Sequence, residues 1–290
     1  MTQSTWDFDS LSGEVVSAES ALAAPGAVNS QISQAIGESI GDAPQPPAPS
    51  DSHVPLPGGI YWEGELLKDA EVRELTGEDE EELARVKGSL ARWVSVLLER
   101  NVVRIGPVTN PSPAMVRKLL IGDRDALLLG IRVATLGREI TAHNVQCPHC
   151  EEFFDATVDL TTVEQVTITE PRPRHEYEVP LRNGRIALVR LPDGAAQEEM
   201  LKAESATLPE RNTSLLAQCL VQVSDASGQA VTPSGAALAR SLGVADRRQL
   251  LQHIHDTQPG PVLNEISFEH EACGKEVILP ITIGELFRGE

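Results

Sequence analysis

The sequence is poor in aromatic residues and in long apolar runs. Phe, Trp and Tyr make up only 3% of the 290 residues, so we expect a core of Leu, Val, Ile and Ala. No apolar run approaches the roughly 20 residues that a membrane-spanning helix needs. The N-terminus also lacks the basic start and apolar stretch of a secretory signal. We therefore expect a cytoplasmic protein that does not associate with membranes.

Positive charge is scarce as well. The chain has 24 Lys and Arg residues against 43 Asp and Glu residues, a formal net charge of -19. Such a surface repels phosphate backbones, which argues against nucleic acid as a partner. It favours solubility and docking on a basic protein partner.

Residues 1–52 contain no Lys or Arg at all and close with the sequence DAPQPPAPS. This composition predicts a disordered acidic arm that ends in a stiff Pro-rich spacer. Within the arm, Ile32, Ile36 and Ile40 lie four residues apart. Two interpretations stay open for them: a solvated tail, or a short helix that docks on a partner.

Two ordered blocks are expected after the arm, at residues 53–164 and 165–290. The first block combines extended segments near residues 60–62 and 70–75 with a helix from the capping box at Thr76 and Asp79 to about residue 100. The acidic run at residues 77–82 is interpreted as the charged start of this helix rather than as a cation site. Pro111 and Pro113 open a short helix, and Asp123 is expected to cap an apolar central helix.

The second block begins with a strong hairpin signal. Two alternating runs are joined by Asn183-Gly184, the pair that a type I′ turn favours. Helical stretches are expected at roughly 194–206, 209–223 and 233–257, followed by a strand, a turn and a strand at the C-terminus. The predicted fold class is α+β, with helical bundles and β-hairpins.

Two short turns carry the ligand types that zinc prefers. Cys147 and Cys150 lie two residues apart between two predicted strands, and His270 and Cys273 repeat that spacing between two others. Zinc takes about four nitrogen or sulfur ligands in a tetrahedron, and Gly274 supplies the permissive backbone that such knuckles need. We predict a structural Zn²⁺ that joins the middle of the chain to its C-terminus.

Other interpretations of these residues stay open. The CPHC sequence is also compatible with an ordinary turn holding reduced thiols or a redox pair, and His143 is an alternative ligand. Cys219 lies on an apolar helix stripe and is interpreted as a buried core thiol. Glu151, Glu152 and Glu271 flank the predicted ligands and are the candidate bases of a zinc hydrolase. His149 is expected to point outward.

Several stretches together resemble one family. They are LPGGIYW, AEVRELTGEDEEEL, LLIGDRDALLLGIRVATLG, the strand into CPHC, and a second knuckle ahead of a final LF. The set resembles the T-even phage baseplate hub assembly family, whose relatives occur in contractile tails and contractile injection systems. Residues 55–160 carry most of the likeness. The family's paired knuckles map onto Cys147, Cys150 and Cys273, with His270 where a cysteine is expected.

The resemblance implies a non-enzymatic baseplate or hub component, or a factor that assembles it. It also implies baseplate, hub or tape-measure proteins as partners. The alternatives are a zinc-stabilised adaptor in another cytosolic complex and, less favoured, a metal-dependent hydrolase.

Overall fold

A computed structural model describes residues 52–87, 89–202, 206–230, 235–263, 266–278, 281 and 286–287 of the chain. The predicted acidic arm, except Ser52, and its isoleucine stripe lie outside the described residues. Among the described residues, no helix is both long enough and apolar enough to cross a membrane.

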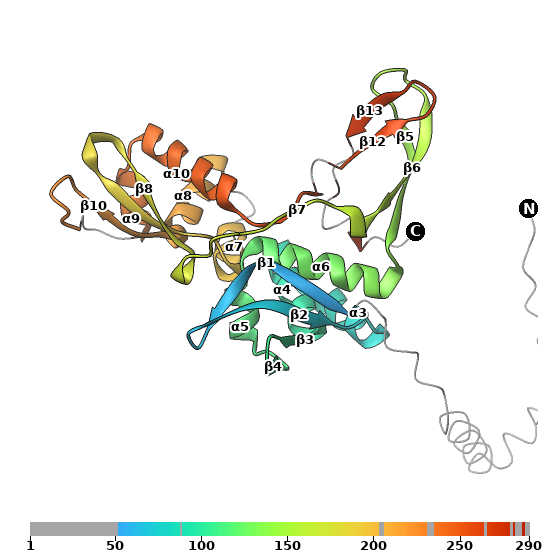
Figure 1. Cartoon of the computed structure of the whole chain (residues 1–290), viewed down its shortest axis with the longest axis horizontal. Coiled ribbons are helices and arrows are strands. Elements are labelled where there is room, and N and C mark those ends of the chain that lie inside the picture. Colours follow the sequence, from blue (N-terminus) through green and yellow to red (C-terminus); the bar gives the residue numbers. More distant parts are fainter. Residues whose placement is uncertain are drawn as a thin grey trace, which may run out of the picture. The chain divides into compact units, whose positions relative to one another are not determined.

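The described residues form eight α-helices and five small antiparallel sheets, which confirms the α+β class (Figure 1). The helices are α3 Gly77–Arg85, α4 Leu90–Asn101, α5 Pro113–Lys118, α6 Ile121–Leu136, α7 Gly194–Leu201, α8 Leu208–Cys219, α9 Gly235–Ser241 and α10 Val244–Thr257. The strands are β1 His53–Trp62, β2 Glu65–Val72, β3 Val102–Ile105, β4 Val108–Thr109, β5 Glu139–Gln146, β6 Phe153–Asp159, β7 Gln165–Val166, β8 Glu176–Pro180, β9 Ile186–Arg190, β10 Leu220–Ser224, β11 Gly260–Pro261, β12 Ser267–His270 and β13 Lys275–Ile278.

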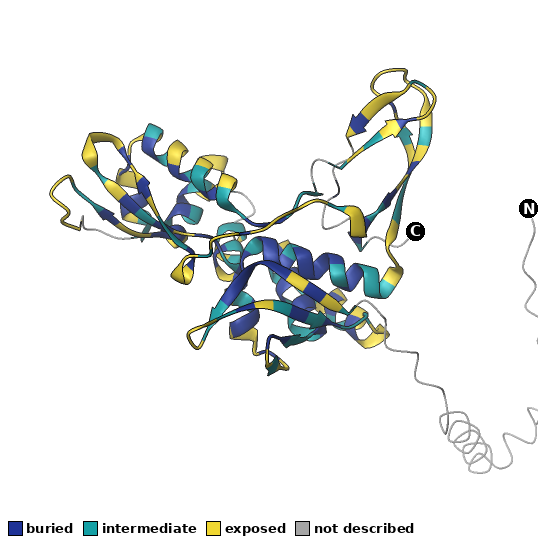
Figure 2. Ribbon diagram, viewed as in Figure 1, coloured by how far each residue is buried: buried dark blue, intermediate teal, exposed yellow. Residues whose placement is uncertain are grey.

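The first core lies where α6 packs against the sheet β1-β2-β3-β4. Figure 2 shows α6 buried along most of its length, as expected for a central apolar helix. Its Leu127, Leu128 and Ile131 are fully buried together with Leu97 and Leu98 of α4. This core contains mainly aliphatic side chains, which agrees with the scarcity of aromatic residues.

Asp123 does not cap α6. The helix begins at Ile121, and Asp123 lies inside its first turn, fully buried. Its carboxylate accepts hydrogen bonds from the backbone N–H groups of Gly58 and Gly59, at 2.7 and 3.3 Å. Burial raises the pKa of Asp123 to about 6 although these donors favour its charged form. The residue therefore ties β1 to α6, a role that local sequence does not encode.

The residues on either side of Asp123 contact three further segments. A Cβ on Gly122 would lie 1.6 Å from the carbonyl oxygen of Pro259, next to β11. The buried Arg124 donates to Ser95 Oγ at 2.8 Å, and a Cβ on Gly194 would collide with its guanidinium. The GDRD sequence is thus the point where β1, β11, α4 and α7 meet α6.

The second core is built by β8, β9 and β10 with α8, α9 and α10. The β8–β9 hairpin is confirmed, and Asn183 and Gly184 both have positive φ, at 59° and 72°, as a type I′ turn requires. The partition into blocks at residue 165 stays a prediction. A third apolar cluster joins Leu129 of α6 with Leu160 and Leu286.

Three predicted helices have different bounds in the structure. The helix expected to reach residue 100 stops at Arg85 and a new one starts at Leu90, because Val86 and Ser89 adopt extended backbone angles. Residues 220–224 form β10 rather than the end of a helix, since their pairing with β9 outweighs helical periodicity. The stretch 233–257 contains two helices, α9 and α10.

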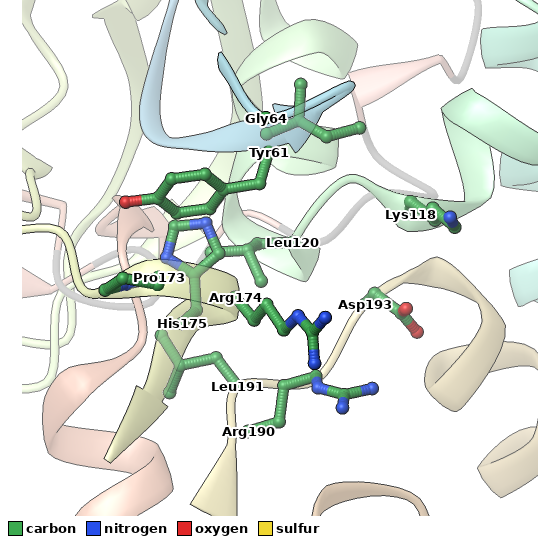
Figure 3. A pocket seen from close by; sticks show the side chains of 11 residues that line it. Tyr61, Gly64, Lys118, Leu120, Pro173, Arg174, His175, Arg190, Leu191 and Asp193 are labelled. Atoms are coloured by element: carbon green, nitrogen blue, oxygen red, sulfur yellow. The ribbon is translucent and has the colours of Figure 1, made fainter. Parts of the chain in front are cut away.

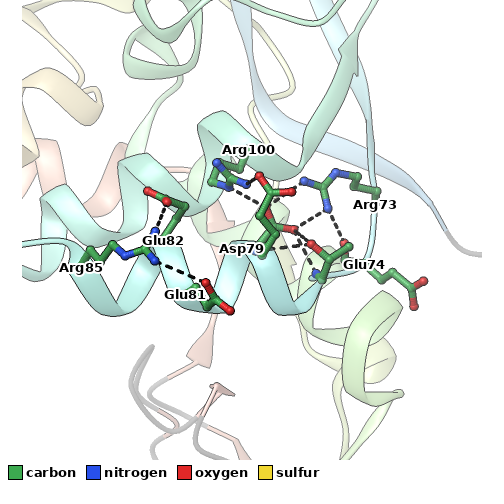
Figure 4. Close-up of polar contacts among 9 residues, drawn as sticks. Arg73, Glu74, Asp79, Glu81, Glu82, Arg85 and Arg100 are labelled. Carbon is green, nitrogen blue, oxygen red and sulfur yellow. Dashed lines mark hydrogen bonds and ion pairs between the residues drawn. The ribbon is translucent and has the colours of Figure 1, made fainter. Parts of the chain in front are cut away.

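The acidic start of α3 is part of an ion-pair network (Figure 4). The capping box of Thr76 and Asp79 is present as predicted. Asp79 is fully buried, and its carboxylate also accepts from Arg73 at 2.6 and 3.0 Å and from Arg100 at 2.6 Å. Burial alone would raise the pKa of Asp79, but these donors hold it well below its usual range.

Replacing Gly122 tests the close approach of α6 to the chain before β11. Alanine is more favourable than glycine inside a helix by about 1 kcal/mol, so this replacement alone would stabilise the fold. The clash of the new Cβ with the Pro259 carbonyl should outweigh that gain and destabilise the protein. We expect Gly122→Ala to lower the free energy of unfolding by about 3 kcal/mol in urea titrations. Gly77→Ala is the matched control, because nothing lies within 4 Å of its Cβ. A Gly122→Ala protein as stable as the parent would contradict this packing.

Asp79→Asn tests the ion-pair network through pH. A carboxylate whose folded pKa is depressed stabilises the fold above its unfolded pKa, about 3.9, and loses that contribution as pH falls further. We expect Asp79→Asn to cost about 3 kcal/mol at pH 7, with a difference from wild type that narrows below pH 4. The exposed Glu81, which pairs with Arg85, is the control, and Glu81→Gln should change little at either pH. If the stability difference between Asp79→Asn and wild type stays the same at every pH, Asp79 is not stabilised as a carboxylate by Arg73 and Arg100.

Candidate metal centre

Two β-hairpins carry the predicted zinc ligands. The β5–β6 hairpin bears Cys147 and Cys150 in its turn, and the β12–β13 hairpin bears His270 and Cys273. Figure 1 shows the two hairpins side by side, and ring contacts join them. The predicted strand-turn-strand arrangement is therefore present at both places.

The two turns share the same backbone design. The N–H of Glu151 donates to the carbonyl of Cys147 at 2.9 Å, and the N–H of Gly274 donates to that of His270 at 2.7 Å. The donating residues, Glu151 and Gly274, both have positive φ, at 62° and 61°. A left-handed residue directly after the second ligand curls each turn and aims its two side chains in one direction. Gly274 was expected in this role from the sequence, whereas Glu151 was not.

The four predicted ligands lie together. Their ligand atoms are all within 4.8 Å of one another. Cys147 Sγ lies 3.8 Å from Cys273 Sγ, while His270 Nδ1 lies 3.5 Å from Cys150 Sγ and 3.3 Å from Cys273 Sγ. A tetrahedron around zinc has sulfur–sulfur edges of about 3.8 Å and sulfur–nitrogen edges of about 3.6 Å. The spacing therefore fits one tetrahedral ion.

The surroundings of the cluster exclude water from one side. Cys147 and His270 are buried. The His270 ring stacks on Phe154, with centroids 4.3 Å apart, and Phe154 also contacts Phe268 of the second hairpin. These aromatic contacts fix the ring of His270, so that its Nδ1 faces the three sulfurs. The sequence carries no signal for the role of Phe154, because its contact with His270 joins residues more than a hundred positions apart.

The electrostatics of the cluster favour thiolate at one sulfur. Burial disfavours the charged form of Cys147, but the N–H groups of His149 and Cys150 and the neighbouring thiols lower its pKa to about 6. At Cys150 the N–H of Glu152 lowers the pKa, while burial and the other sulfurs raise it by more, so the net shift is upward. Three thiols in one space disfavour simultaneous ionisation unless a cation is present. The donor set thus suits a divalent metal ion.

The other candidates lie elsewhere. His143 Nδ1 lies 2.9 Å from Asp155 Oδ2 and is not part of the cluster. Cys219 is buried in the second core, where burial raises its pKa to about 12, as expected for a core thiol. His149 is exposed as expected, yet its Nε2 lies 3.1 Å from the Glu276 carbonyl oxygen of the other hairpin.

The suggested bases of a hydrolase lie at the surface of the turns. Glu151, Glu152 and Glu271 are all exposed. A hollow of about 580 Å³ lies against the cluster and is lined by Glu152, Glu271 and His270 among others. Catalytic zinc needs an open coordination position, and the four side chains already supply four ligand atoms. A tetrahedral ion held by these four ligand atoms would have no open coordination position.

Comparison with protein families gives one match. Residues 65–288, most of the chain, match the family described as T4 bacteriophage base plate protein. The matched range includes both knuckles, α6, the second core and the first core apart from its β1 residues. Searches of the curated proteins and of the solved structures found no match.

Proposed function

This chain belongs to the T4 bacteriophage base plate protein family, and on that premise we propose that it is a non-enzymatic hub component or assembly factor of a phage-like contractile particle. The family match over residues 65–288 carries this proposal. Its partners would be other baseplate, hub or tape-measure proteins, met in the cytoplasm where such particles assemble. The net charge of -19 supports docking on basic partner surfaces.

We further propose that Cys147, Cys150, His270 and Cys273 hold a structural Zn²⁺. The tetrahedral spacing of the four ligand atoms supports this assignment. The ion would close a loop whose inner ligands are 120 residues apart. Closing such a loop costs on the order of 4 kcal/mol of chain entropy, well below the roughly 10–16 kcal/mol that structural zinc supplies.

A role in assembly is favoured over catalysis. Zinc would be fully coordinated by protein, so a substrate carbonyl or a water molecule would have no position on it. The exposed Glu151, Glu152 and Glu271 are then solvated surface charges. A rigid, metal-closed hairpin pair serves a protein that must present one fixed surface to several partners.

Metal analysis tests the zinc assignment. We expect one zinc per purified chain, and its loss in Cys147→Ser and His270→Ala. Both variants should melt about 10 °C lower, because an ion bound only by the folded state stabilises it. Cys219→Ala and His143→Ala are the controls: the first should lower the Tm while zinc stays bound, and the second should change neither. Variants that lose zinc but melt with the parent would refute a structural role.

Particle assembly tests the function. The whole cluster of tail genes is expressed with and without this chain, and particles are counted by electron microscopy. We expect incomplete baseplates without the chain, rescue by wild type and by His143→Ala, and poor rescue by His270→Ala. Mass spectrometry of finished particles separates a permanent component from a factor that leaves. Complete, contractile particles in the absence of the chain would contradict the proposal.

A further inference from the structure

A pocket outside the metal cluster is lined by a different set of residues. A pocket of about 610 Å³ opens between β1, the end of α5 and residues 173–193, within the range typical of small-ligand sites (Figure 3). Three basic side chains line it: Lys118, Arg174 and Arg190. In a chain with 43 acidic and 24 basic residues, such a gathering of positive charge is a local exception.

The ring of His175 lies beneath the pocket and is buried. His175 is 5% exposed, and its Nε2 lies 2.9 Å from the carbonyl oxygen of Gly59, so Nε2 carries the hydrogen. Burial lowers the pKa of His175, which keeps the ring neutral and leaves a lone pair on Nδ1. Nδ1 is buried and has no hydrogen-bond partner among the described residues. A buried acceptor without a donor costs about 1–3 kcal/mol, so His175 is held in place at the expense of stability.

The backbone at the rim is strained in a way that serves the pocket. Arg174 and His175 are consecutive non-glycine residues with positive φ, at 58° and 51°. Each such residue costs roughly 1–2 kcal/mol. Hydrogen bonds from His175 N to Arg172 O and from Leu191 N to His175 O hold them there. The result places Arg174 over the pocket and the His175 ring in its floor (Figure 3).

The three cations are incompletely neutralised. Arg190 pairs with Glu176 at 2.9 Å, and the Lys118 ammonium lies 5.2 Å from the centre of the Trp62 ring. In the described part of the chain, no acidic side chain forms an ion pair with the exposed Arg174. Figure 3 shows the guanidinium groups of Arg174 and Arg190 directed into the same space. Like charges held together in this way attract an anion.

We propose that this pocket binds an acidic peptide segment of a partner protein, with a carboxylate held by Arg174 and Arg190. Planar carboxylates match the two-pronged guanidinium. The Asp193 carboxylate on the wall repels a doubly charged phosphate more strongly than a singly charged carboxylate, which favours an acidic side chain over a phosphate group. The inference rests on the proposed assembly role only for the origin of the peptide.

Fluorescence anisotropy with a defined probe tests the pocket. A dye-labelled hexapeptide with two central glutamates is titrated with the full-length protein, beside its twin with two glutamines. We expect the glutamate peptide to bind at least about 10-fold tighter, and salt to weaken it. Arg174→Gln and Lys118→Gln should each weaken binding, the first by about 10-fold. Arg182→Gln is the matched control, because it removes the same charge from an exposed turn outside the pocket.

Each outcome is decisive. Equal binding of the two peptides, no binding of either, or equal weakening by Arg182→Gln would overturn the proposal. Tight binding of inorganic phosphate without binding of the glutamate peptide would also overturn it and identify an inorganic anion site. The peptide titration and the particle experiment can also disagree. If the protein binds the glutamate peptide selectively but particles form normally without the chain, the pocket proposal holds and only the assembly role is refuted.

Discussion

The fold depends on the first turn of α6, which has no unused space. Gly122 lies against the Pro259 carbonyl, Asp123 holds the backbone of Gly58 and Gly59, and Arg124 fills the position under Gly194. Each contact reaches a different segment, so one helical turn positions the entry strand, the start of α7 and the chain that leads to the C-terminal hairpin. A buried turn of this kind combines a helix-breaking glycine and two charged residues for reasons of packing, not of helix propensity.

Local features were predicted well from the sequence, and features set by distant contacts were not. The capping box at Thr76 and the turn at Asn183 involve residues three or fewer positions apart, so their chemistry is visible in the sequence. The burial of Asp123 and the strand at residues 220–224 depend on β1 and β9. Periodicity alone assigns such residues to a cap or a helix.

The Cys/His cluster and the basic pocket also differ in how far the sequence predicts them. The Cys/His cluster could be predicted from the sequence because each half is a short turn with paired ligand types, and their matching spacing indicated that the two halves meet. The basic pocket has no spacing signal, since its lining comes from several separate segments. The only sequence signal for the pocket is the group of basic residues around Pro173. By composition alone, this group looks like an ordinary charged loop.

The matched left-handed residues at Glu151 and Gly274 have a mechanical meaning. They turn two hairpins toward one point, and an ion bound at that point would make the chain between Cys150 and His270 a closed loop. A tensile load applied to the ends of the chain would then run through the metal–ligand bonds and bypass the loop. The second core, with α8 and α10, lies inside that loop. In a particle that contracts, this core would remain folded and unloaded while the segments outside the loop bear the pull.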